Sequence, residues 1–177
     1  SVTTRTAGFA SVSQSGLTNG SKLLASMLMI IGGSPAGTAG GIKTTTVAVL
    51  LLTAISVLRG NKDTECYGRK ITFEIIRVGI TITLVTFVFW LFGVTVMTVI
   101  EPQQKVLDLM FEATSAMATV GLTADLTPVL SDISHVVLML MMYIGRIGPM
   151  TMALIFSGHV DKKNQFRTLP EAKIMVG

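Results

Sequence analysis

The sequence predicts an all-α membrane protein built from helices and re-entrant loops. Half of its 177 residues are apolar, only 14% are charged, and the mean hydropathy is +0.66, whereas soluble domains are about a quarter charged. Residues 78–100 are 23 consecutive uncharged residues, which as a helix would cross a hydrocarbon layer of about 30 Å. Aromatic residues are few and no basic stripe accompanies them, so we expect the lipid bilayer, and no nucleic acid, as a partner.

The first apolar stretch, residues 23–58, is expected to form two half-helices around a break. Ten residues of this stretch contain five glycines and one proline, which are unfavourable inside a helix by roughly 1 and 3 kcal/mol each. Non-helical backbone at membrane depth is tolerated only where protein buries it or where it lines a water-filled path. The break is therefore a candidate site, either a gating loop or a segment that lets helices pack closely. Its residues are Gly32, Gly33, Ser34, Pro35, Ala36, Gly37, Thr38, Ala39, Gly40 and Gly41.

Basic residues gather in two segments that flank the later stretches. Residues 59–77 contain five Lys or Arg and residues 161–177 contain four. Because cytoplasmic loops are enriched in these residues, we expect a cytoplasmic loop at 59–77 and a cytoplasmic tail at 161–177. Between them, 78–100 is an unbroken span and 133–160 is a third apolar stretch, so the chain is expected to be multi-pass with its C-terminus in the cytoplasm.

Residues 105–118 have the composition of a helix that, at about 21 Å, is too short to span a bilayer. The sequence Thr119-Val120-Gly121-Leu122 follows it, and a similar sequence, Thr6-Ala7-Gly8-Phe9, lies near the start of the chain. Glycine allows backbone carbonyls to turn inward together, and a threonine hydroxyl adds an oxygen, which suits a dehydrated cation such as potassium. We expect these eight residues to be ion-binding filter strands, with potassium at Thr6, Gly8, Thr119 and Gly121.

The two Thr-x-Gly segments belong to a longer internal similarity. A shift of 113 residues superimposes Thr6 on Thr119, Gly8 on Gly121, Ser21 on Ser134 and Gly32 on Gly145. In both copies, a glycine-containing turn precedes an apolar stretch that glycine disrupts. Such repeats are common in transport proteins, which often place the ion site at the repeat interface, although chance matches between Gly- and Thr-rich segments remain an alternative.

Three charged residues lie close to these segments. Arg146 falls inside the third apolar stretch, where a charge costs at least about 2.5 kcal/mol, so it should face a wet cavity or a partner, or else snorkel or cap carbonyls. Glu112 and Asp125 flank the second Thr-x-Gly segment and could concentrate cations at a pore mouth, with a turn as the favoured alternative for Asp125. We recognise no Ser/His, Asp/Asp or His-x-x-x-His catalytic arrangement within the spans, so we do not expect an enzyme.

Four of these segments, residues 4–9, 32–44, 111–123 and 145–149, occur in an order that resembles the Ktr/Trk/HKT superfamily of potassium transporters, most closely its Ktr-type membrane subunits. The resemblance covers nearly the whole chain. It implies four helix, pore-loop, helix repeats around a pseudo-fourfold pore. Residues 1–58 would be the third filter strand and the broken second helix of repeat 3, residues 78–160 all of repeat 4, and the N-terminal half of the subunit would be missing.

The same resemblance implies potassium uptake across the plasma or inner membrane through a selectivity filter, with residues 32–41 as an intramembrane gating loop and Arg146 as its latch or barrier. It further implies sodium promotion with Na+ as a second ion, a homodimer, a cytoplasmic nucleotide-binding regulatory ring as partner, and no organic cofactor. The alternative function is an ion-coupled secondary transporter of a small solute, because broken helices build those sites too. Such a carrier does not need the repeated Thr-x-Gly segment.

Overall fold

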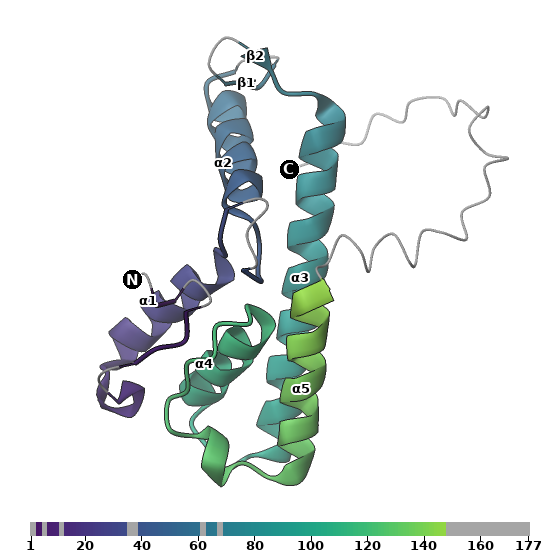
Figure 1. The fold of residues 1–177 in the computed structure, drawn as a ribbon. Coiled ribbons are helices and arrows are strands. Elements are labelled where there is room, and N and C mark those ends of the chain that lie inside the picture. Colours follow the sequence, from purple (N-terminus) through teal and green to yellow (C-terminus); the bar gives the residue numbers. More distant parts are fainter. Residues whose placement is uncertain are drawn as a thin grey trace, which may run out of the picture.

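A computed structural model describes residues 3–4, 7–10, 13–34, 39–60, 63–66 and 69–147. Within these residues the chain is mostly helical, as predicted, and contains one short β-hairpin (Figure 1). The elements in chain order are the 3-10 helix η1 (Gln14–Gly16), α1 (Asn19–Ile30), α2 (Thr44–Leu58), β1 (Glu65–Cys66), β2 (Arg69–Lys70), α3 (Phe73–Ile100), α4 (Val106–Met117), the 3-10 helix η2 (Thr127–Val129) and α5 (Asp132–Ile147).

The predicted break in the first apolar stretch is confirmed, because α1 ends at Ile30 and α2 begins at Thr44. The two helices run in different directions on either side of it (Figure 1). Backbone hydrogen bonds close the base of the break: the Gly32 amide donates to the Ile42 carbonyl at 2.9 Å, the Ile42 amide to the Ile30 carbonyl at 3.0 Å, and the Thr44 amide to the Gly33 carbonyl at 3.2 Å. Pro35, Ala36, Gly37 and Thr38 lie outside the described residues.

The long helix α3 is the one helix in the described part of the chain that is long and apolar enough to cross a membrane; α2 is apolar but shorter. It begins at Phe73 rather than at the predicted residue 78. The prediction took Glu74 and Arg77 as loop residues, but charged side chains are tolerated in the first turns of a spanning helix, where they can reach the interface. Among the described residues of the segment 59–77, β1 and β2 form an antiparallel pair, and those from Phe73 onward belong to α3.

Helices α4 and α5 pack against the second half of α3 (Figure 1). The predicted short helix at 105–118 is confirmed as α4. Its apolar face joins the two longer helices in one buried cluster: Val94, Met97, Leu109, Ala113, Ala116, Met117, Leu126, Leu130, Leu138 and Met141. The Met141 side chain of α5 packs directly on Gly93 of α3: a Cβ atom there would lie 2.4 Å from the Met141 sulfur, so the methionine would have to shift. Helix α5 covers the first half of the predicted third stretch, whose remainder lies outside the described residues.

Local elements recur at the spacing found in the sequence. The 3-10 helices begin at residues 14 and 127, and α1 and α5 begin at residues 19 and 132, a separation of 113 in both cases. Each 3-10 helix is followed by a leucine whose amide donates back to its first carbonyl, Leu17 to Gln14 and Leu130 to Thr127. The two copies therefore share local backbone structure as well as residues.

Candidate functional site

The two Thr-x-Gly segments lie against each other. Their glycines share a left-handed backbone, with φ of +67° at Gly8 and +86° at Gly121, a conformation that costs other L-residues roughly 1–2 kcal/mol. A Cβ atom on Gly8 would lie 2.7 Å from the Val120 carbonyl oxygen, and one on Gly121 would lie 3.8 Å from the Gly8 Cα. The fold thus joins two glycines that are 113 residues apart and leaves no room for a side chain on Gly8.

The predicted filter residues differ in their surroundings. Val120 and Leu122 are buried, whereas Ala7 is exposed and Phe9 is 85% exposed in the described part of the chain. Thr6 lies outside the described residues. The two segments are therefore similar in sequence but differ in the burial of their apolar side chains.

The second segment starts directly from the C-terminus of α4. The Thr119 amide donates to the Ala116 carbonyl at 3.0 Å and the Val120 amide to the Ser115 carbonyl at 2.9 Å, and Thr119 has a φ of +53°. These bonds end the helix and redirect the chain. They leave the Thr119 hydroxyl oxygen buried without a hydrogen-bond partner in the described part of the protein, and such a group costs about 1–3 kcal/mol unless something binds it.

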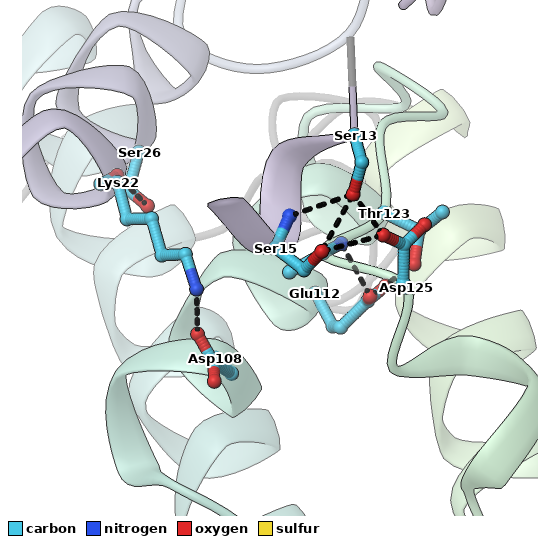
Figure 2. Close-up of polar contacts among 9 residues, drawn as sticks. Ser13, Ser15, Lys22, Ser26, Asp108, Glu112, Thr123 and Asp125 are labelled. Carbon is cyan, nitrogen blue, oxygen red and sulfur yellow. Dashed lines mark hydrogen bonds and ion pairs between the residues drawn. The ribbon is translucent and has the colours of Figure 1, made fainter. Parts of the chain in front are cut away.

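A buried carboxylate, Glu112 on α4, supports the second segment from behind (Figure 2). It is 4% exposed and accepts hydrogen bonds from the Thr123 hydroxyl, from the Ala124 amide at 3.0 Å and from the Thr127 hydroxyl at 3.0 Å. The expectation that Glu112 concentrates cations at a mouth is therefore wrong, because its oxygens point into protein. Its position fixes the chain that follows Leu122.

On the exposed side, Asp125 joins the chain that follows the second segment to the chain that follows the first. Its carboxylate accepts hydrogen bonds from the hydroxyls of Ser13 and Ser15, the latter at 2.8 Å (Figure 2). These bonds, first that from Ser13, lower the pKa of Asp125. A φ of +60° agrees with the favoured expectation of a turn residue. Asp125 also lines a cavity of about 220 Å³ together with both glycines, Gly8 and Gly121.

The break between α1 and α2 reaches the start of the second segment. A Cβ atom on Gly40 would lie 2.5 Å from the Thr119 hydroxyl oxygen and 2.7 Å from the Ala118 carbonyl oxygen. The Lys43 ammonium donates to the Ala39 carbonyl at 2.8 Å, which holds the returning strand of the break. Among the described residues of the predicted loop, Gly40 thus lies in direct contact with Thr119, the first residue of the second Thr-x-Gly segment.

Helix α5 approaches the same end of α4. A Cβ atom on Gly145 would lie 1.9 Å from the Met117 carbonyl oxygen, so Gly145 is required for this contact. Arg146 is the next residue, in the last turn of α5 and exposed in the described part of the chain. Two segments therefore contact the C-terminus of α4: the break, through Gly40, and α5, through Gly145.

An ion pair links the other ends of α1 and α4. The Lys22 ammonium lies 2.7 Å from the Asp108 carboxylate, with the two side chains 7% and 20% exposed (Figure 2). Sequence reasoning missed this pair, because 86 residues separate its members and neither carries a local signal. It also missed Ser13 and Ser15, which look like ordinary loop serines until the fold brings them to Asp125.

Comparison with known proteins agrees with the resemblance. The family model described as TrkH, cation transport protein, matches residues 1–167. The Ktr system potassium uptake protein B of Bacillus subtilis is 36% identical over 99% of this chain and 39% of its own length. The potassium/sodium uptake protein NtpJ of Enterococcus hirae is 36% identical over the whole chain and 40% of its own length. The Ktr system potassium uptake protein B of Vibrio alginolyticus is 34% identical over 89% of the chain. The chain thus spans about two fifths of the length of the first two relatives.

Proposed function

Because the chain belongs to the TrkH family of cation transport proteins, we propose that it forms part of a potassium-uptake subunit and supplies two of its four filter strands. The observation that carries this proposal is the contact between Gly8 and Gly121, two left-handed glycines in equivalent segments. Several oxygens must replace the hydration shell of a potassium ion. Strands from two segments that meet at their glycines can direct carbonyls into one space.

The Thr119 hydroxyl supports the same proposal. This oxygen is buried and without a partner in the described part of the chain, and a dehydrated potassium ion would satisfy it. The partially negative C-terminus of α4 lies beside it, which also favours a cation. Potassium would accordingly bind at Thr119 and Gly121 from the second segment and at Thr6 and Gly8 from the first.

We propose that residues 32–41 gate the pore under the filter and that Arg146 forms the barrier or latch. The support is that Gly40 packs against Thr119 and Ala118, while Gly145 packs against the neighbouring Met117. A segment of small residues can move aside at little steric cost. Backbone hydrogen bonds join the two ends of the loop at its base, so movement of the loop would displace this base with it.

A larger assembly is part of the proposal. Two strands cannot surround an ion, so the filter needs the two repeats expected in the N-terminal part of the subunit, and residues 78–160 would be the complete fourth repeat. The multi-pass subunit would lie in the cell membrane with its C-terminus in the cytoplasm. We further propose that the subunit forms a homodimer and binds a cytoplasmic nucleotide-binding ring. Sodium, an ion that the name of one relative includes, would promote its uptake of potassium.

The substitution Gly121→Ser in the full-length subunit tests the filter. Serine at a φ of +86° is strained, so the carbonyls should turn away from the ion. In uptake-deficient cells at limiting potassium, growth should fail and the preference for potassium over sodium should drop about tenfold. The matched control is Gly20→Ser, where a Cβ atom would meet nothing within 4 Å. Unchanged growth and ion preference in Gly121→Ser would overturn the filter assignment.

A further inference from the structure

A second cavity lies between α3, the base of the break and the C-terminus of α4. Its volume is about 130 Å³, and its lining includes Thr86, Phe87 and Trp90 of α3 and Gly41 and Ile42 of the break. An engineered apolar cavity of about 150 Å³ stays dry and takes up benzene or xenon. The cavity beside the break is therefore large enough for part of a hydrocarbon molecule.

The hydroxyl groups on the wall of this cavity are already satisfied. Thr83 donates to the Gly79 carbonyl at 2.9 Å and Thr86 to the Ile82 carbonyl at 2.8 Å, both within α3. Thr114 donates to its own helix and accepts from the Trp90 indole at 2.9 Å. A bound water needs two to four polar partners, which this wall does not offer. The chemistry of the wall selects an apolar ligand.

The position of the cavity along α3 identifies that ligand. Trp90 lies only about 5 Å along the axis from the middle of this helix, which runs from Phe73 to Ile100. In a bilayer spanned by α3, this is the depth of acyl-chain ends and not of headgroups. Phe87, one of the lining residues, is 56% exposed in the described part of the chain, so the cavity adjoins the outward surface of α3. We propose that it binds the end of an acyl chain of a bilayer phospholipid.

Such a chain would touch the base of the gating loop. Gly41 and Ile42 line the cavity, and the Ile42 backbone forms two of the hydrogen bonds that close the break. Hydrocarbon in this space would prevent the base of the loop from moving toward α3, and it would therefore slow potassium uptake. This coupling rests on the proposed function, whereas lipid binding does not.

Fluorescence of Trp90 tests the binding, since it is the one tryptophan in these 177 residues. The full-length subunit is placed in phosphatidylcholine vesicles whose chains carry bromine near the terminal methyl, and a Trp90→Phe variant supplies the background. We expect Thr86→Phe, which fills the cavity, to reduce the quenching of Trp90 at least twofold. Thr95→Phe is the matched control, because Thr95 is an exposed residue of the same helix with the same bond to its own backbone. Equal quenching in the parent, Thr86→Phe and Thr95→Phe would overturn the site.

Two further measurements separate the remaining outcomes. If Thr86→Phe does not fold, Thr83→Phe fills the cavity from the next position along its wall and gives the same readout. Weak quenching in the parent would mean that another part of the subunit occupies the space, which also overturns the proposal. An acyl chain exchanges with the bilayer, whereas the introduced ring fills the space permanently. Potassium uptake should therefore fall about threefold in the filled variant but not in Thr95→Phe. Equal uptake with reduced quenching would overturn the coupling to the loop while leaving lipid binding intact.

Discussion

The carboxylate of Glu112 shows how one residue can fix the geometry of a whole segment. Buried carboxylates are costly unless hydrogen bonds satisfy them. Here three donors do so, and all three follow Leu122 within the next five residues. The side chain therefore acts as an anchor between α4 and the chain that leaves the second Thr-x-Gly segment.

Replacing Glu112 with alanine should weaken both stability and ion preference. The buried Ala124 amide would lose its acceptor, a loss of about 1–3 kcal/mol, and the second Thr-x-Gly segment, the proposed filter strand, would lose its rear support. We expect the preference for potassium over sodium to fall about tenfold, measured as rubidium uptake with sodium as competitor. Glu112→Gln, which keeps one oxygen, should show a smaller loss, and Glu65→Ala on the exposed hairpin should show none. A less stable variant with unchanged preference would reduce Glu112 to a structural role.

Arg146 is the residue whose removal should increase transport. It follows Gly145, which packs on the C-terminus of α4, so its charge lies close to the proposed ion path. Arg146→Ala should raise potassium uptake several-fold, because a positive charge near the path repels cations. Arg146→Lys, which keeps the charge, should stay close to the parent. Unchanged uptake in a normally folded Arg146→Ala variant would exclude the barrier role.

Among the elements, the break between α1 and α2 packs closely against the start of the second Thr-x-Gly segment. Gly40→Ala would place a methyl group 2.5 Å from the Thr119 oxygen, so the loop must shift away. We expect maximal potassium uptake to rise about threefold, measured in cells that express the full-length subunit. Gly16→Ala, at a site with nothing within 4 Å, is the control. An uptake rate equal to that of the parent would show that the loop does not restrict the path.

The elements were largely predictable because their signals are local. Apolar length marks α3, the glycines and proline of residues 32–41 end α1, and the short apolar face of α4 is complete within its own residues. The start of α3 was mispredicted because charged residues such as Glu74 and Arg77 are typical of loops. In the structure they lie in the first turns of α3. The role of Glu112 was mispredicted for a different reason. Its place in the sequence does not reveal that its side of α4 faces Thr123 and Ala124.

At the scale of the whole molecule, polar contacts between distant segments hold the fold together at several points. Lys22 pairs with Asp108, Asp125 accepts from Ser13 and Ser15, and Glu101 at the end of α3 accepts from the start of α5. None of these contacts was predictable. Each depends on how the helices pack against one another, whereas sequence patterns indicate only the individual helices. Apolar patterning sets the helices, and these contacts fix their relative positions.

Glu101 gives this arrangement a dependence on pH. Hydrogen bonds from Ser131, chiefly its side chain, and from Ser134 lower the pKa of Glu101 below its usual value. A carboxylate with a lowered pKa in the folded state stabilises above its unfolded pKa, about 4.3, and this contribution is lost as the pH falls through the folded value. The thermal midpoint of the solubilised full-length subunit should therefore be lower in Glu101→Gln than in the parent at pH 7, and the difference should shrink below about pH 4. Glu65→Gln, an exposed change in the hairpin, should leave the midpoint unchanged at pH 7. A constant difference between Glu101→Gln and the parent from pH 7 to pH 3 would mean that packing, and not the charge of Glu101, joins α3 to α5.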